Sequence, residues 1–282
     1  MEKKDSHDKP LPFAEDDSKN PPAKSLLDRL TRRFSRPAYV IVVLLLYLLA
    51  STAIGFALAP ALFFFSHLFS WSQNLPQFIR WIALGFGLAV GFFIFGFTLL
   101  IVVSIYNWLL PTKVRPFKGG YYSIKAVPWF LHNGLFYLVR FTFLPFVTLT
   151  PFGILFLKAM GMKLGRHVFI NTEYISDPQL ITLGDDVAIG GSVRIFAHYG
   201  GHGNLVVAPV HIEERATIGL AATIMGDVHI GADATLLAHS VLMPGSRVGK
   251  GEVWGGIPAR RIRREEMEVF KEGIEKVSKV QT

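Results

Sequence analysis

Apolar residues recur every six positions along the second half of the chain. A small or β-branched residue commonly stands four positions after each aliphatic one, as at Ala216, Ala222 and Ala234. An amphipathic helix repeats about every 3.6 residues and a half-buried strand about every 2, so neither explains this pattern. A period of six is typical of a parallel β-helix with three short strands per coil. The aliphatic series is Leu183, Ile189, Ile195, Ile212, Ile218, Ile224, Ile230, Leu236, Leu242 and Val248.

The period is interrupted once, between Ile195 and Ile212. These two residues are seventeen positions apart, which indicates two hexapeptides and an excess of five residues. The interrupted stretch contains a His- and Gly-rich segment over residues 198–204. Functional residues concentrate in loops that leave a regular scaffold. The sequence therefore predicts that the functional site lies in this excursion.

Two uncharged apolar stretches precede the repeat, Ala38–Phe65 and Trp81–Leu110. Each is longer than the roughly 20 residues that a membrane-spanning helix needs. A mildly polar segment, Ser66–Ile79, connects them. The first stretch is too long and too far from the chain start for a cleavable signal peptide, so we expect a retained anchor.

A third apolar stretch, Val127–Leu157, contains Arg140, Pro145 and Pro151. A charge near the centre of a span costs roughly 2.5 kcal/mol or more, and the two prolines leave pieces too short to cross. Its many aromatic residues favour an interfacial helix lying on the bilayer. Basic clusters follow the second and third stretches and also precede the first. Because positive charge stays on the cytoplasmic side, we expect two spans and a cytoplasmic C-terminal domain.

The composition agrees with a membrane protein. Hydrophobic residues make up 51% of the 282 residues and charged residues 18%, and the net charge is +8. The basic residues cluster beside the apolar stretches, which favours anionic lipid over nucleic acid as their partner. The chain has no Cys, which excludes a disulfide framework, a catalytic thiol and Cys-based zinc sites.

The organisation that follows has five parts. We predict a disordered tail over residues 1–24, a membrane anchor over 25–112 and an interfacial connector over 113–163. A β-helix is predicted over 164–262, followed by a short C-terminal helix over 263–282 that covers the end of the coil stack.

Three features together resemble the hexapeptide-repeat acyltransferases over about residues 164–262. They are the period of six, the His-bearing excursion before Pro209-Val210-His211-Ile212, and the terminal Gly256-Ile257-Pro258-Ala259-Arg260. This resemblance implies a left-handed parallel β-helix, a homotrimer, an acyl-CoA donor lying between subunits, and a catalytic His. The polylysine synthetases are similar in carrying hydrophobic segments near such a domain. The hydrophobic segments leave the acceptor open, and we expect a membrane lipid or a lipid-linked saccharide.

Acyl transfer from a thioester to a hydroxyl needs a general base, and a His with an ordinary pKa near 6.5 suits that role. His198 is the first candidate, because it matches the family His at the end of a strand, and His202 is the second. A carboxylate could orient the base, and Asp177, Glu173 and Asp185 are all open for this role. Asn171 is a candidate for contact with the acceptor.

Other residues are candidates for binding the donor. Arg260 and Arg261 stand where the family places a cation near CoA, while Gly219 and Ala238 could line the pantetheine groove. Small residues are equally what tight corners require. The remaining histidines of the repeat are expected at the surface, and Asp185-Asp186 is expected to form a solvated turn rather than a metal site. No metal is expected.

Two other functions are compatible with a β-helix. A γ-carbonic-anhydrase-like enzyme would need three His around one zinc, for which His167, His198 and His202 are available. A non-catalytic trimeric membrane scaffold would use the β-helix as a rigid stalk.

Overall fold

The protein is described by a computed structural model over residues 35–121, 123–201, 204–263 and 265–266, without the side chains of residues 35–39. Within these residues the chain forms two compact units. One comprises residues 115–118 and the chain from Met162 onward, and the other comprises the chain up to Val114 together with Gly119–Gly161. The predicted tail over 1–24 and most of the predicted C-terminal helix lie outside the described residues.

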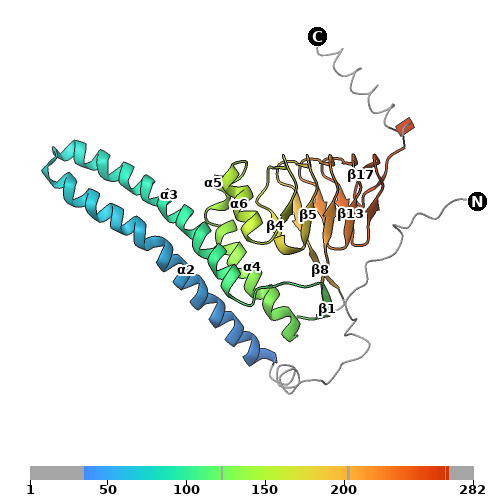
Figure 1. The fold of residues 1–282 in the computed structure, drawn as a ribbon, viewed down its shortest axis with the longest axis horizontal. Helices are drawn as coiled ribbons and strands as arrows, with labels where there is room; N and C mark the ends of the chain where they lie inside the picture. Colours follow the sequence, from blue (N-terminus) through green and yellow to red (C-terminus); the bar gives the residue numbers. More distant parts are fainter. Residues whose placement is uncertain (1–34, 122, 202–203, 264, 267–282) are drawn as a thin grey trace, which may run out of the picture. The chain divides into compact units, whose positions relative to one another are not determined.

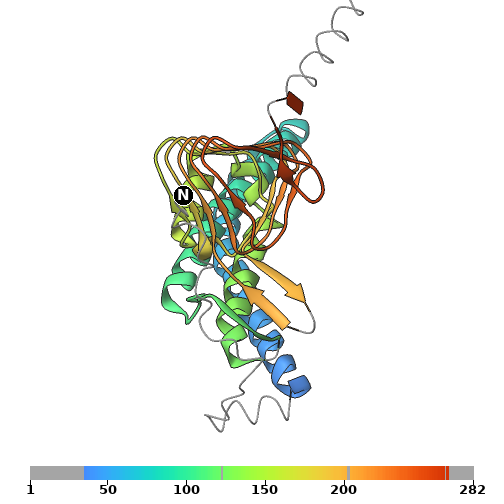
Figure 2. The ribbon, with the colours of Figure 1, turned by 90° about the vertical axis from the view of Figure 1, so that its right-hand side faces the viewer.

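The first unit is a parallel β-helix with three faces, as predicted (Figures 1 and 2). One face is the sheet β16-β13-β10-β5-β2, the second is β18-β17-β14-β11-β6-β3, and the third is β15-β12-β7-β4. Strands in the first are β2 (Lys163–Leu164), β5 (Ile181–Leu183), β10 (Val210–Ile212), β13 (Val228–Ile230) and β16 (Arg247–Val248). Strands in the second are β3 (Phe169–Ile170), β6 (Ala188–Ile189), β11 (Thr217–Ile218), β14 (Thr235–Leu236), β17 (Val253–Gly255) and β18 (Arg260–Arg261). Strands in the third are β4 (Ile175–Ser176), β7 (Arg194–Phe196), β12 (Thr223–Ile224) and β15 (Val241–Leu242).

The period of six fixes the core of this unit. Ile212 pairs with Ile230, and Ile230 with Val248, so one coil takes eighteen residues and three hexapeptides. The repeated aliphatic side chains fill the interior, and Ile189, Ile195 and Ile224 are fully buried. Burial of each such side chain contributes about 1.5–3 kcal/mol. The coils stack because every backbone strand finds a partner above or below it.

The excursion is larger than predicted and is a β-hairpin. Ile195 pairs with Ile224, 29 residues later, instead of eighteen, so the excess is eleven residues and not five. The extra residues form β8 (His198–Gly201) and β9 (Asn204–Val207), which pair antiparallel. Val207 lies twelve positions after Ile195 and so fits a period of six, although it belongs to the hairpin. A third strand, β1 (Phe117–Gly120), borders β9 in a sheet ordered β1-β9-β8.

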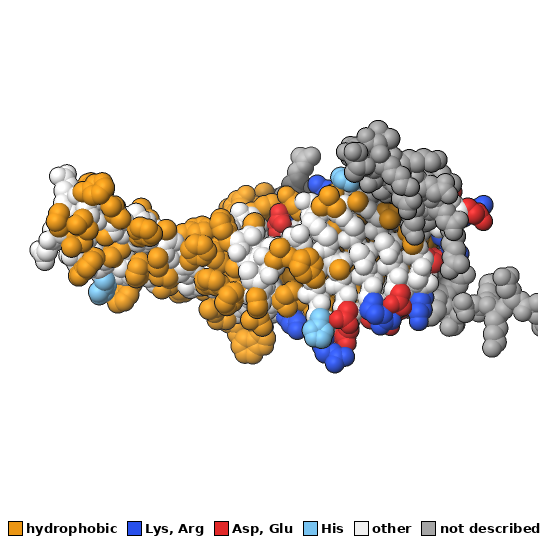
Figure 3. Space-filling model, turned by 90° about the horizontal axis from the view of Figure 1, so that it is seen from above, with side chains coloured by type: hydrophobic (Ala, Val, Ile, Leu, Met, Phe, Trp, Pro, Cys, Tyr) orange, Lys and Arg blue, Asp and Glu red, His pale blue; other side chains and the backbone are white. Residues whose placement is uncertain are grey.

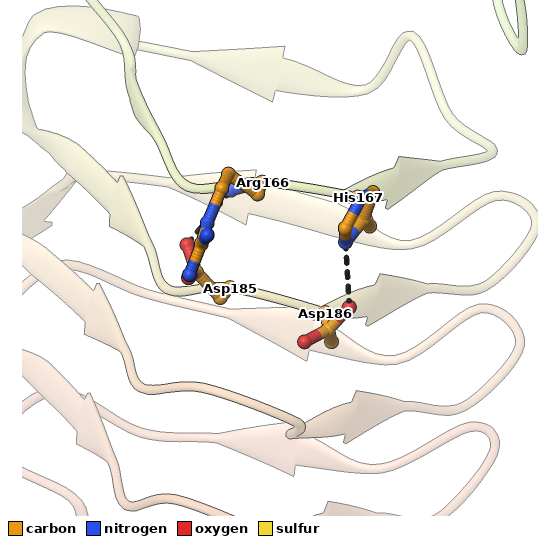
Figure 4. A network of polar contacts seen from close by, with 4 residues as sticks. All are labelled: Arg166, His167, Asp185 and Asp186. Carbon is orange, nitrogen blue, oxygen red and sulfur yellow. Dashed lines mark hydrogen bonds and ion pairs between the residues drawn. The ribbon is translucent and has the colours of Figure 1, made fainter.

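Ion pairs between successive coils line one corner of the β-helix. Arg166 donates through its backbone N–H and guanidinium to Asp185, and His167 Nδ1 lies 3.2 Å from Asp186 Oδ1 (Figure 4). The hydrogen bonds from Arg166 lower the pKa of the Asp185 carboxyl. Figure 3 shows acidic and basic side chains gathered along one edge of this unit. Asp185 and Asp186 thus hold adjacent coils together at an exposed turn.

The second unit is built on two long apolar helices, α2 (Ser35–Trp71) and α3 (Gln77–Leu109). Only η2 (Ser72–Asn74) and two residues separate them, so the predicted link Ser66–Ile79 is helical at both ends. Uncharged polar residues such as Ser66 and Ser70 allow this because their hydroxyls bond to carbonyls one turn earlier. By length and composition, both helices could cross a membrane.

Three shorter helices complete this unit. After η3 (Ile124–Ala126) come α4 (Val127–Arg140), α5 (Leu144–Val147) and α6 (Pro151–Ala159). Pro145 and Pro151 stand in the first turns of α5 and α6, where a proline is tolerated because its missing N–H would have no partner within the helix. Leu131, Leu135 and Phe136 of α4 are buried, and α4 packs against both α2 and α3.

Candidate active site

Asp177 and His198, an acid and a base, lie at the corner that follows the third sheet. Strands β4 and β7 are paired with Ile175 opposite Ile195 and Ser176 opposite Phe196. Asp177 directly follows β4, and His198 begins β8 two residues after Phe196. Because parallel strands end at the same edge of a sheet, the two side chains leave neighbouring coils side by side. A 3-10 turn, η4 (Pro178–Leu180), then carries the chain away from Asp177.

His198 and Asp177 form a hydrogen-bonded dyad. The distance from His198 Nδ1 to Asp177 Oδ2 is 2.6 Å. The Asp177 side chain has no exposed surface, whereas 23% of the His198 side chain is exposed. A carboxylate at Nδ1 accepts a hydrogen bond from the N–H of that nitrogen, so Nε2 is left as the basic one. The dyad therefore presents a fixed acceptor of protons at a partly exposed corner.

The coil beneath the dyad supports its backbone. A Cβ on Gly226 would lie 3.0 Å from the backbone nitrogen of His198, so the two coils are in close contact here. The aromatic ring of Phe196 packs beside the imidazole, with ring centroids 6.0 Å apart. These contacts hold His198 on the β-helix and not on the free part of the hairpin.

An ion pair of the next coils lies at the same corner. Arg247 Nη2 is 2.6 Å from Asp227 Oδ1, and the same arginine donates to the backbone carbonyl of Asp227. Burial, and secondarily the charge of Asp227, raise the pKa of the Tyr199 phenol. The sequence does not single out Asp227 or Arg247, because an excess of five residues puts Asp227 out of register with His198. The excess of eleven aligns them, since Ile195 pairs with Ile224.

Of the three carboxylates considered for orienting the base, the structure brings Asp177 to His198. Glu173 lies on the turn between β3 and β4 together with Asn171, at the preceding corner. Asp185 lies at another corner, between β5 and β6, and binds Arg166. His202 lies outside the described residues.

No family model matches the chain. Over 108 residues it is 32% identical to a delta-poly-L-ornithine synthetase of Acinetobacter baumannii, a match that covers 38% of this chain and 8% of that protein. It is 36% identical over 98 residues to a mitochondrial gamma carbonic anhydrase 2 of Arabidopsis thaliana, which covers 34% of this chain and 31% of that protein. The matched segment thus spans less than a third of the length of either relative.

Among solved structures, the chain is similar to a hexapeptide-repeat acetyltransferase of Vibrio cholerae in complex with acetyl-CoA. The identity is 30%, the TM-score is 0.34, and the match covers 36% of this chain and 60% of that one. The β-helix is built from hexapeptide repeats, three to each coil.

Gly219 and Ala238 lie on the hexapeptide-repeat domain at a corner different from that of His198. Gly219 follows β11 and Ala238 comes shortly after β14, so both are on the turns that lead from the second sheet to the third. A Cβ on Gly219 would come within 2.5 Å of the Ala238 nitrogen. The two residues are in contact because the corner is tight, and this accounts for the small side chains.

Gly219→Ala is expected to lower the melting temperature of the detergent-solubilised protein. The added Cβ meets backbone atoms, and such overpacking costs about 1–3 kcal/mol. Gly201→Ala is the matched control, because a Cβ there has no atom within 4 Å. Equal melting temperatures for the two variants would show that the Gly219 corner has room for a side chain.

Arg260 and Arg261 form the exposed strand β18 at the end of the hexapeptide-repeat domain. Strand β18 pairs antiparallel with β17. Arg260 contacts Glu266 at 3.2 Å, and Arg261 contacts Glu252 at 3.0 Å. Both guanidinium groups are about two-thirds exposed in these ion pairs, so each is open to a further anion.

Two of the remaining histidines stack on the outer face of the first sheet. His211 on β10 is directly opposite His229 on β13, and Arg247 follows on β16. His229 Nε2 lies 3.1 Å from Glu213 Oε1. Burial lowers the pKa of His211, and the charges of His229, Lys163 and Arg247 lower it further. Both side chains are half-buried rather than at the open surface.

Stability is expected to fall as the pH falls through the range in which a free histidine titrates. Because the folded pKa of His211 is lowered, the unfolded chain binds a proton near its ordinary pKa of about 6.5 while the folded chain does not. The contribution is fully present above that pH and is lost below it. In His211→Gln, the melting temperature should change less between pH of about 7.5 and about 5.5 than in the parent. The matching exchange at exposed His239 should leave the dependence unchanged, and an unchanged dependence in His211→Gln would contradict the assignment.

Within the described part of the chain, no three His, Asp or Glu side chains are grouped so that they could hold a metal ion. His167 binds Asp186, and His198 binds Asp177. Two of the three histidines considered for zinc are thus each engaged with a carboxylate of their own.

Proposed function

We propose that the protein transfers an acyl group, most simply acetyl, from acyl-CoA to a hydroxyl or an amine. The observation that carries this proposal is the dyad of partly exposed His198 and buried Asp177, with Nδ1 of the imidazole 2.6 Å from Oδ2 of the carboxylate. Thioester transfer needs a base for the acceptor and an acid for the departing thiol. One oriented imidazole supplies both in turn. The chain has no Cys, so a thiol intermediate on the enzyme is excluded.

The reaction follows from the orientation of the imidazole. Nε2 of His198 takes the proton from the acceptor O–H or N–H while the oxygen or nitrogen attacks the thioester carbon. The tetrahedral intermediate collapses with cleavage of the C–S bond. The thiolate of CoA leaves and receives the proton from Nε2. Asp177 stabilises the imidazolium between these steps, and backbone N–H groups of the exposed Gly200-Gly201 segment would stabilise the oxyanion.

The donor is proposed to lie along the coils, with its phosphates at Arg260 or Arg261. These guanidinium groups suit phosphate oxygens, and both are exposed. The pantetheine arm would pass along the outside of the Gly219–Ala238 corner. That corner is not the corner of His198. A homotrimer, in which one subunit brings its donor groove to the dyad of the next, would reconcile the two positions, with three sites per trimer.

The acceptor is proposed to be a lipid or a lipid-linked saccharide at the cytoplasmic face of a membrane, with Asn171 and Glu173 as candidate contacts. Support comes from the two long apolar helices and from the basic residues that follow them, including Lys113, Arg115 and Lys118. An anchored enzyme meets a membrane acceptor at a raised local concentration. Nucleic acid is not proposed as a partner.

Transfer can be measured directly. The purified protein is incubated in detergent with a native lipid extract and radiolabelled acetyl-CoA, and the label in the organic phase is counted. We expect label in a lipid or lipid-linked glycan that depends on the protein. Absence of transfer with acetyl-CoA and with longer acyl-CoA donors would contradict the proposal.

The likeness to a gamma carbonic anhydrase supports a second candidate, a zinc enzyme. It would require His167, His198 and His202 to converge on one metal, across subunits. Stoichiometric zinc in metal analysis of the purified protein, together with CO₂ hydration, would favour it. A scaffold without activity would bind neither CoA nor zinc, so a thermal-shift titration with CoA and the metal analysis together separate all three functions.

A further inference from the structure

Two tryptophans near the ends of α3 indicate how deep each residue of this helix would lie in a bilayer. Trp81 and Trp108 are both exposed, at 66% and 82%. At 1.5 Å per residue they are about 40 Å apart along the axis, which matches the roughly 40–45 Å of a bilayer with its headgroups. Tryptophan is enriched at both interfaces, and Arg80 stands beside Trp81. The centre of the bilayer then falls near residue 95 of α3, between Phe93 and Phe97.

Helices α4 and α6 both contact α3 at its C-terminal end. His132 Nδ1 of α4 lies 2.9 Å from Asn107 Oδ1. The amide of the same asparagine donates to the carbonyl of Ala159, the last residue of α6, at 3.2 Å. The first half of α4 and the end of α6 are therefore at the level of Asn107, close to the interface that Trp108 marks.

The segment between them contacts α3 much deeper. The ring of Phe143 lies 5.3 Å from Phe97 and 5.6 Å from Phe92, and the ring of Phe152 lies 4.9 Å from Phe97. A Cβ on Gly96 would overlap the ring of Phe143, so the absence of a side chain there admits it. Gly96 is about 16 Å along the axis from Asn107. The chain thus descends by about half of a bilayer's hydrocarbon thickness and returns.

We propose that α4, α5 and α6 form a re-entrant hairpin that enters one leaflet, lies among its acyl chains and returns to the same side. This inference rests on the membrane placement in the proposed function. The surface it would give to lipid is strongly apolar, with no charged residue from Phe141 to Leu157. The exposed side chains are Phe141, Phe146, Leu149, Phe152 and Leu155, each more than half exposed.

At the two breaks between these helices, threonine hydroxyls bind backbone carbonyls that lipid could not satisfy. Carbonyl groups left open by a helix end must find partners inside the protein when lipid surrounds them. Thr142 donates to the carbonyl of Leu138 at 2.6 Å, Thr148 to that of Leu144 at 2.9 Å, and Thr150 to that of Val147 at 2.6 Å. Each threonine thus satisfies a carbonyl at a break.

The hairpin has two charged side chains: Lys158 stands at the end of α6, level with Ala159, and Arg140 is shielded from lipid. Arg140, at the end of α4, is only 8% exposed. Its guanidinium lies over the rings of Tyr137 and Phe141, at 5.2 and 5.1 Å from their centroids. Aromatic faces stabilise a cation where water is excluded, so this charge is compatible with the hairpin's depth.

The absence of Cys from the chain makes single-cysteine spin labelling direct. Phe146→Cys and Phe152→Cys would be labelled with a nitroxide in nanodiscs of phosphatidylcholine and phosphatidylglycerol. Collision with oxygen, which dissolves in lipid, is compared with collision with a water-soluble nickel chelate. Phe86→Cys on α3 is the control for the anchor, since Phe86 is 71% exposed. Lys250→Cys, on an exposed turn of the β-helix, is the control for water.

We expect Phe146→Cys and Phe152→Cys to favour oxygen as strongly as Phe86→Cys, and Lys250→Cys to favour the nickel chelate. If Phe86→Cys is lipid-exposed and both hairpin positions meet the chelate, the hairpin lies outside the bilayer. The inference then fails, while the membrane placement of the two long helices stands. If neither reagent reaches the hairpin positions, a protein partner covers them, and the inference fails too. If Phe86→Cys also meets the chelate, the membrane placement itself is wrong.

Discussion

His198→Ala is expected to reduce acyl transfer by a factor on the order of 10²–10⁴, which is the usual contribution of a general base. The imidazole is held by Asp177 at 2.6 Å and by the coil beneath it, so its removal deletes the base without removing a core side chain. The turnover number is measured with saturating acetyl-CoA and lipid extract. The melting temperature should stay close to that of the parent. His239→Ala, at an exposed corner, is the control and should retain full activity.

The second histidine of the excursion is expected to matter less. His202 stands beyond Gly200 and Gly201, and a base needs a rigid support to stay within about 3 Å of the acceptor proton. His202→Ala should therefore change acceptor binding more than turnover. If His202→Ala is the inactive variant and His198→Ala stays within about tenfold of the parent, the two roles are exchanged and the assignment of the base is wrong.

Asp177→Asn is expected to lower the turnover number by a factor of about 10² with little change in KM for acetyl-CoA. The amide keeps the size of the buried side chain but removes the negative charge that stabilises the imidazolium and orients the ring. A purely structural role would instead reduce the melting temperature and the amount of folded protein. Asp185→Asn is the matched control, since this carboxylate pairs with Arg166 at another corner. Equal turnover in Asp177→Asn and the parent would remove Asp177 from the mechanism.

Much of the architecture could be predicted from the sequence because the β-helix is a one-dimensional stack. Each coil contacts only its neighbours, so the spacing of Ile212, Ile230 and Val248 in the chain is also their alignment in space. The length of the excursion could not be predicted in the same way. Val207 satisfies the period of six while lying in an antiparallel hairpin. Periodicity does not record the direction of a strand.

The choice of Asp177 over Glu173 and Asp185 also required the fold. All three carboxylates precede His198 within one coil or slightly more, and corner positions depend on how many residues each turn takes. Ile170 to Ile189 is nineteen residues and Ile175 to Ile195 is twenty. These small departures from eighteen decide which acid meets the base. The packing of α4 against α2 and α3 could likewise not be predicted from the sequence, since an aromatic-rich apolar helix suits both a membrane interface and a helix bundle.

The central claim, that His198 transfers acyl groups to a membrane acceptor, is tested most directly in cells. Lipids and lipid-linked glycans are extracted from cells that lack the protein and produce either the parent or His198→Ala at equal levels, and their masses are compared. We predict a species that is heavier by the mass of one acyl group with the parent and is absent with His198→Ala. Identical lipid and glycan masses in the two cell lines would contradict the claim.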